Sequence, residues 1–322
     1  MTKPLPQPTG PYTIGLHKVD LHDPYRKEIT YPEGRLIPIQ FYFPCEAGEH
    51  SPQPKVFEHR APQEFSPLEA LGYSKPTSFS QILPGKHPLI LFNHGNQVAM
   101  TDYACIAEDL ASHGYVVVAI QHQLSTDGVQ APFLNGRSTA KHGQIIDNLL
   151  YVFDWLKTHY GETIDTNKVG LIGHSMGGNA LLLLSNRIFG TFRKGISSLL
   201  PREDKNQDTH ECIVFLDGEF TYPRTKIHPI MFCLSEERKP FQEMNGTLED
   251  LQRIGYPFHH YKGTRHISFM DHSAVNGEPY FNGTESERIA FWNDLRRDIR
   301  DFLRENMVID LAPTFYPYIN RV

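Results

Sequence analysis

One short stretch in the middle of the chain, residues 168–184, constrains the fold more than any other. Val169–Ile172 is an apolar run long enough for a buried strand, and Ala180–Leu184 begins an apolar helix. Between them, Gly173-His-Ser-Met-Gly177 fits the pattern G-x-S-x-G, in which a serine lies on a tight turn from strand to helix. The glycines let the two elements approach closely. The stretch therefore predicts an α/β protein in which Ser175 is a nucleophile.

A serine hydroxyl is a weak nucleophile at neutral pH, so Ser175 needs two partners. A histidine must accept its proton, and a carboxylate must hold that histidine in the correct tautomer. In α/β-hydrolases the carboxylate and then the histidine follow the serine along the chain. His266 follows the last predicted strand, Tyr256–Tyr261, in a loop that contains a glycine. We expect His266 to be the base, with His272 as the alternative.

Two positions compete for the role of the acid. Asp217 ends the predicted strand Glu211–Leu216, although an Asp-Gly pair is also typical of a simple turn. Glu236 and Glu237 end the next predicted strand, Pro229–Leu234, although glutamates beside two cations are also typical of a solvated cluster. The positions of these residues leave the choice open.

Apolar strands alternate with helical patterns along the chain. This alternation predicts a mostly parallel central sheet with helices on both faces, and active-site groups at the carboxyl ends of the strands. Further strands are expected at residues 12–20, 35–43, 88–92 and 115–120, and helices at 67–71, 101–113, 138–159, 240–254 and from Thr284, whose capping-box partner is Glu287, to about 305.

We expect one domain, with its less regular segments set apart by composition. Residues 12–322 form the domain, and it holds a Pro-rich insertion at about 45–87. The Pro-rich residues 1–11 are expected to be a flexible tail, and two polar segments are candidate lids, about 122–137 and about 190–210.

Composition and charge exclude several classes of function. The net charge of −6, without a long basic run, argues against nucleic acid as a partner. No apolar run is long enough to span a bilayer, and the N-terminus has no apolar signal-peptide core. The four cysteines lack paired spacing, which favours free thiols. We expect a cytoplasmic protein if the chain is complete, and a secreted or periplasmic one if a signal peptide has been removed. The sequence does not indicate the oligomeric state.

Five motifs together resemble the platelet-activating factor acetylhydrolase family, plasma-type and bacterial, of the α/β-hydrolase superfamily. They are Asn93-His-Gly95, Asp109–Tyr115, Gly173–Gly178, Phe215-Leu-Asp217 and His266–Asp271.

This resemblance implies an α/β-hydrolase fold and assigns the catalytic roles. It selects Asp217 as the acid and His266 as the base. It also implies an oxyanion hole formed by the backbone amides of Asn96 and Met176, and the second of these also follows from its place at a helix N-terminus. His94, beside the first amide, is interpreted as a structural histidine under the oxyanion loop.

The resulting prediction is a serine ester hydrolase that cleaves short-acyl carboxylic esters, with phospholipid-like esters as one candidate class, through an acyl-enzyme and without a cofactor or metal. Unlike plasma-type members of the family, the chain lacks apolar lipoprotein-binding helices in residues 45–87. One alternative is a broad carboxylesterase or a cutinase-like polyester hydrolase. An alternative of another class is a catalytically inactive protein that binds a small ligand.

Overall fold

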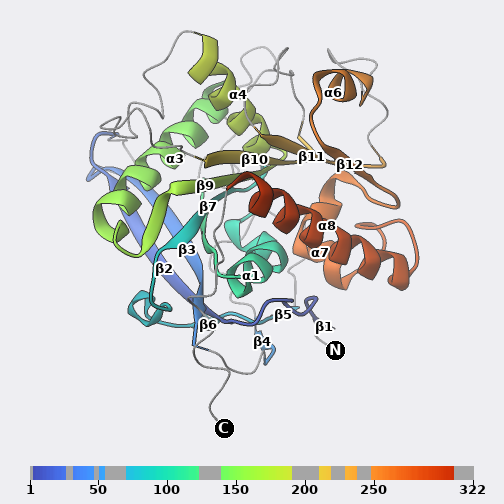
Figure 1. The fold of residues 1–322 in the computed structure, drawn as a ribbon, viewed down its shortest axis with the longest axis horizontal. Coiled ribbons are helices and arrows are strands. Elements are labelled where there is room, and N and C mark those ends of the chain that lie inside the picture. The colour runs from blue at the N-terminus through green and yellow to red at the C-terminus, as the bar shows by residue number, and fades with distance from the viewer. Residues whose placement is uncertain are drawn as a thin grey trace.

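A mixed β-sheet runs through the centre of the structure, which is a computed structural model (Figure 1). The structure describes residues 3–26, 32–46, 51–54, 70–122, 139–190, 210–218, 229–237 and 248–307. Within these ranges the sheet has nine strands in the order β12-β11-β10-β9-β7-β8-β3-β2-β6. Their bounds are β2 Thr13–Asp23, β3 Arg35–Cys45, β6 Lys75–Pro76, β7 His87–Asn93, β8 Val116–Ile120, β9 Ile164–His174, β10 His210–Leu216, β11 Ile230–Ser235 and β12 Phe258–Tyr261.

The six strands β12, β11, β10, β9, β7 and β8 run parallel to one another, whereas β3 is antiparallel to both of its neighbours, β2 and β8. The parallel strands are covered on both faces, which explains why their sequences are continuous apolar runs. All five residues of β8, for example, are buried.

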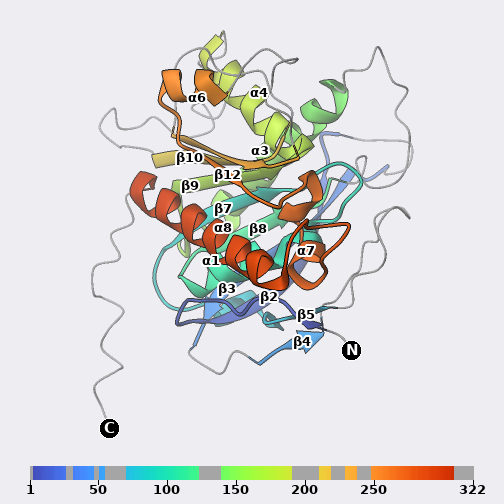
Figure 2. The same ribbon diagram turned by 90° about the vertical axis from the view of Figure 1, so that its right-hand side faces the viewer.

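Helices cover both faces of the sheet, as Figures 1 and 2 show. On one face, α1 (Ala104–Ser112) and α8 (Glu285–Asn306) pack with the short α7 (Asp271–Val275). On the other face lie α3 (Thr139–Tyr160), α4 (Met176–Gly190) and α6 (Leu248–Ile254). The buried apolar side chains on the two faces form two separate clusters, with the sheet between them.

The arrangement confirms the predicted α/β-hydrolase fold, with a mostly parallel sheet between two helical layers. The capping box predicted for the last helix is also present, because Thr284 accepts a hydrogen bond from the Glu287 amide and the Glu287 carboxylate accepts one from the Thr284 amide. The helix predicted at 101–113 is shorter, since its first turn is the 3₁₀ helix η2 (Met100–Tyr103).

The N-terminal residues differ from the flexible tail that composition predicted. Lys3–Pro4 forms strand β1, which pairs with β5 (Ala70–Gly72), and Leu5 is buried. Thr9 donates to the buried carboxylate of Asp109 on α1 through its amide and its hydroxyl, both at 2.9 Å. A proline-rich segment can pack well wherever its few amides and its apolar side chains find partners, and composition does not show these partners.

The 45–87 insertion holds short elements in its described part, namely β4 (Gln53–Pro54), β5, β6 and the 3₁₀ helix η1 (Phe79–Gln81). The predicted helix at 67–71 is wrong for its last two residues, which lie in β5 and pair with β1 and β4. Its first three residues lie outside the described residues, as do nearly all of both candidate lids and residues 240–247 of the predicted helix at 240–254.

Candidate active site

Ser175 lies at the turn where β9 passes into α4, as its motif predicted. Its φ is +52°, a left-handed conformation that a serine adopts only when the surrounding structure enforces it. The Ser175 amide donates to the Leu216 carbonyl of β10 at 2.9 Å. A Cβ on Gly173 would lie 2.6 Å from the Gly178 amide nitrogen, and a Cβ on Gly177 would collide with the Asn93 carbonyl of β7. Both glycines are therefore needed for the close approach of strand and helix.

Asp217 directly follows β10, the neighbour of β9 in the sheet. In the register of these strands Leu216 is opposite His174, so Asp217 and Ser175 both lie just beyond the same edge of the sheet. The Asp217 side chain is fully buried. It accepts hydrogen bonds from the amide and the hydroxyl of Ser235, each at 2.9 Å. Ser235, the last residue of β11, was missed by the sequence interpretation, because it lies far from any recognised motif.

His266 joins the other two side chains. Its Nδ1 lies 2.8 Å from Oδ2 of Asp217, and its Nε2 lies 2.9 Å from Oγ of Ser175. Since a carboxylate only accepts hydrogen bonds, Nδ1 carries the proton and Nε2 is left as the acceptor for the serine hydroxyl. The His266 side chain is about a third exposed, at 35%, whereas its acid partner is at 0%. The imidazole of His266 is thus partly open to solvent and is oriented by Asp217 from the buried side.

The alternative acids have other partners. The carboxylate of Glu236 accepts the Gly263 amide at 2.6 Å, and that of Glu237 accepts the His266 amide at 3.1 Å. Both glutamates therefore bind the loop that carries His266, and neither takes the position behind its imidazole. Glu237 is a second residue that the sequence interpretation did not assign to this role.

The alternative base, His272, lies on α7 and is buried, with its ring 5.3 Å from that of Tyr280. Its neighbour Asp271 accepts the amides of Ala104 at 2.8 Å and Cys105 at 2.9 Å, at the first turn of α1. A carboxylate is favourable at a helix N-terminus, so this contact fixes the segment after the base to α1.

The loop after β7 carries the first expected oxyanion donor, the Asn96 amide. His94 is fully buried, and its Nδ1 donates to the Gly95 carbonyl at 2.6 Å, while its Nε2 accepts the His122 amide at 2.8 Å. In a trans peptide the carbonyl and the next amide point in opposite directions. By holding the Gly95 carbonyl, His94 therefore fixes the direction of the Asn96 amide.

Burial keeps His94 neutral, since it lowers the pKa of this imidazole to about 4. Burial also lowers the pKa of His122, whose Nε2 donates to the Asn93 side chain at 3.0 Å. His94 was interpreted from the sequence as a structural histidine, and its contacts agree with that role.

The second expected donor is the amide of Met176. Met176 is the first residue of α4, and it is buried next to Ser175. The amides of a first helical turn have no partner within the helix and attract negative charge. An ester carbonyl placed over Ser175 would meet this helix end on one side and the loop after β7 on the other. This arrangement supports an oxyanion hole at Met176 and Asn96.

Three further observations concern the described residues. All four cysteines lie within them and are free thiols. No group of three or more His, Cys, Asp or Glu side chains in these ranges is arranged to hold a metal ion. No helix among them combines the length and the apolar character needed to cross a bilayer.

Several known proteins are similar to this chain. The model of the chlorophyllase family matches residues 46–199. A platelet-activating factor acetylhydrolase of Canis lupus familiaris is 25% identical over 301 residues, which cover 73% of this chain and 64% of that protein. A probable 1-alkyl-2-acetylglycerophosphocholine esterase of Arthroderma benhamiae is 25% identical over 214 residues, covering 55% and 54%. These matches confirm the resemblance that the motifs suggested.

The chain spans between about half and two thirds of the length of such curated relatives. Among solved structures, a ferulic acid esterase from Streptomyces cinnamoneus matches with a TM-score of 0.66 and 17% identity, covering 100% of this chain and 96% of that one. At this identity the likeness concerns the fold, and it agrees with the α/β-hydrolase architecture described above.

Proposed function

We propose that this α/β-hydrolase chain, which is similar to the platelet-activating factor acetylhydrolases, is a serine ester hydrolase. The observation that carries the proposal is the chain of two hydrogen bonds from Ser175 through His266 to the buried Asp217. Three parallel strands bring these residues to one edge of the sheet, from positions up to 91 residues apart. The strained backbone of the serine turn supports the same assignment.

The geometry supports a two-step mechanism. Ser175 Oγ attacks the ester carbonyl carbon as its proton passes to Nε2 of His266, and Asp217 stabilises the resulting imidazolium. The amides of Asn96 and Met176 donate to the oxyanion of the tetrahedral intermediate. The imidazolium then gives its proton to the departing alkoxide, which leaves an acyl-enzyme. Water attacks this ester with the same base, and the carboxylic acid is released as Ser175 regains its proton.

We infer that the substrates are carboxylic esters with short acyl groups. The support is the similarity to proteins named platelet-activating factor acetylhydrolase and 1-alkyl-2-acetylglycerophosphocholine esterase. The similarity in fold to a ferulic acid esterase favours, as a second candidate, a carboxylesterase that accepts varied alcohols. Both candidates use the same triad and differ only in the ester that they prefer.

The test is hydrolysis of p-nitrophenyl esters from acetate to decanoate, followed by phospholipid esters with a short sn-2 chain. Ser175→Ala should abolish turnover and leave the fold intact. Ser185→Ala is the matched control, because it removes another serine hydroxyl of the same region, one that is buried and donates to the Leu182 carbonyl within α4 at 2.8 Å. Unchanged hydrolysis by Ser175→Ala would refute the proposal. A catalytically inactive binding protein would give no turnover even before substitution.

A further inference from the structure

Two buried polar side chains that the mechanism does not use lie beneath the site. Tyr103 is the last residue of η2, and His174 directly precedes Ser175 at the end of β9. Their exposed fractions are only 1% and 2%. Buried polar groups are costly unless they are hydrogen-bonded, and these two are bonded to each other and to both neighbouring loops.

The chemistry of the partners sets the direction of each hydrogen bond. Nε2 of His174 lies 3.0 Å from the His266 carbonyl oxygen, which only accepts, so Nε2 is the donor. In the neutral imidazole, Nδ1 then accepts the Tyr103 hydroxyl at 2.8 Å. The Tyr103 oxygen in turn accepts the Gly95 amide at 3.2 Å. These groups form one continuous chain from the Gly95 amide to the His266 carbonyl.

The neutral form of His174 also suits its surroundings. Its ring centroid lies 4.8 Å from that of His266, which gains a positive charge during the proposed reaction. A second imidazolium at this distance, away from solvent, would be strongly unfavourable. With a neutral His174, every group in this series of hydrogen bonds has a partner. The proposed base, His266, can then become charged without a like charge beside it.

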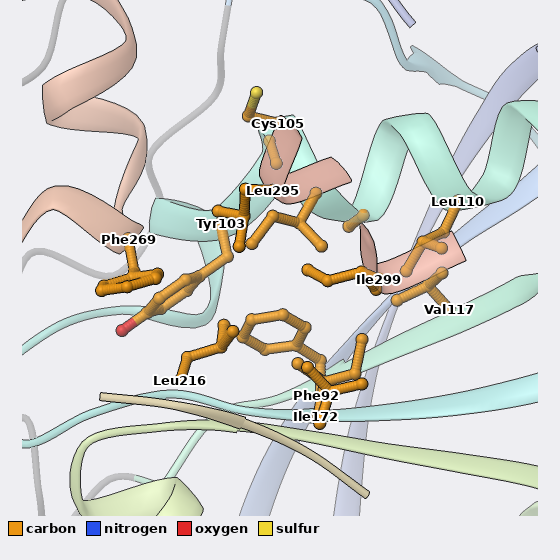
Figure 3. Close-up of a cluster of buried hydrophobic side chains, with 14 of the residues drawn as sticks. Phe92, Tyr103, Cys105, Leu110, Val117, Ile172, Leu216, Phe269, Leu295 and Ile299 are labelled. Atoms are coloured by element: carbon orange, nitrogen blue, oxygen red, sulfur yellow. The ribbon is translucent and has the colours of Figure 1, made fainter. Parts of the chain in front are cut away.

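Packing leaves these side chains little freedom. The Tyr103 ring lies 4.8 Å from the Phe92 ring, and Figure 3 shows it among apolar side chains near Phe269, with its hydroxyl directed out of the cluster. A Cβ on Gly95 would lie only 3.0 Å from Nδ1 of His174. The oxyanion loop therefore rests directly on the imidazole.

We propose that Tyr103 and His174 are positioning residues for ester hydrolysis. Their hydrogen bonds join the loop that carries the Asn96 amide to the loop that carries the base. The oxyanion donor and the base must act on one substrate carbonyl, so their relative position affects the rate directly. Glu237 fixes the other backbone group of His266, its amide, and His174 thus completes the support of the base. This inference rests on the proposed function.

The first test compares Tyr103→Phe with the matched control Tyr73→Phe. Tyr73 is also buried, and its hydroxyl donates to the Leu5 carbonyl at 3.2 Å, so it takes no part in the hydrogen bonds between Gly95 and His266. Each variant loses one buried hydroxyl, so both should lose stability. Tyr103→Phe should lower kcat by about 10- to 100-fold with KM changed less than about twofold, because a misplaced catalytic group affects mainly the transition state. Tyr73→Phe should change kcat less than about twofold.

The second test uses two replacements of His174. His174→Gln can place an amide N–H near the position of Nε2 and so keep the donor to the His266 carbonyl. His174→Asn is too short and keeps only a group near Nδ1. We expect the Gln variant to keep at least about fivefold more kcat than the Asn variant.

Equal kcat for Tyr103→Phe and Tyr73→Phe, or for the two His174 variants, would overturn the positioning role while the proposed function stood. If Tyr103→Phe fails to fold, as circular dichroism would reveal, the His174 pair decides alone. A wild-type protein that neither hydrolyses esters nor reacts with a fluorophosphonate would instead refute the proposed function, and the positioning role with it.

Discussion

We predict how the buried His94 changes the free energy of unfolding with pH. The pKa of His94 is lowered to about 4 from its ordinary value of 6.5, because burial disfavours the charged imidazole. The unfolded chain therefore binds this proton at a higher pH than the folded chain does. The contribution of His94 to stability is complete above pH 6.5 and is lost as the pH falls from 6.5 to 4.

The size of the effect follows from the pKa difference. A difference of about 2.5 units at about 1.4 kcal/mol per unit corresponds to about 3 kcal/mol between pH 8 and pH 4. The pKa of His122 is lowered in the same sense, so the wild-type protein should lose more than this in total.

The variant that isolates the contribution is His94→Asn, which has no titrating group and can still donate to the Gly95 carbonyl. The free energy of unfolding of both proteins would be measured by urea denaturation at pH 8, 6, 5 and 4. The difference between wild type and variant should fall by about 3 kcal/mol from pH 8 to pH 4, with most of the change between pH 6 and 4. A difference that is independent of pH would mean that His94 is not a buried neutral imidazole, and the account of the oxyanion loop would fail.

Three further substitutions test the choice of acid and the serine turn. Asp217→Asn should lower kcat by about 10⁴-fold, because the histidine tautomer is no longer held. Glu236→Gln, whose side chain can still accept a hydrogen bond from the Gly263 amide, should change kcat by less than about threefold. The reverse ranking in a steady-state ester assay would mean that Glu236, after β11, is the acid. Gly177→Ala should cost about 2 kcal/mol or more, measured by thermal unfolding, because the added methyl collides with the carbonyl at the end of β7; a wild-type Tm would contradict the close approach.

Much of the fold could be predicted from the sequence because its signals are local. The buried strands are apolar runs, the serine turn needs its glycines, and Thr284 with Glu287 forms a capping box within one turn. The position of His266 was predictable for a similar reason, since it lies in the loop after the last strand.

The remaining features depend on contacts between distant segments. From position alone, Asp217 and Glu236 were equivalent, and only the sheet register brings one carboxylate behind the imidazole while the other binds the Gly263 amide. Ser235 and Tyr103 bear no motif, and their roles arise from partners 18 and 71 residues away. The N-terminal segment was mispredicted because proline content indicates little regular structure and says nothing of docking.

If the groups around Ser175 make its hydroxyl reactive, as proposed, a fluorophosphonate should label it covalently. Wild-type protein would be treated with a fluorophosphonate, digested and mapped by mass spectrometry. We expect a single modified serine, Ser175, and labelling at least about a hundredfold slower in Asp217→Asn. A label on another residue, or equal labelling rates in the two proteins, would contradict this expectation.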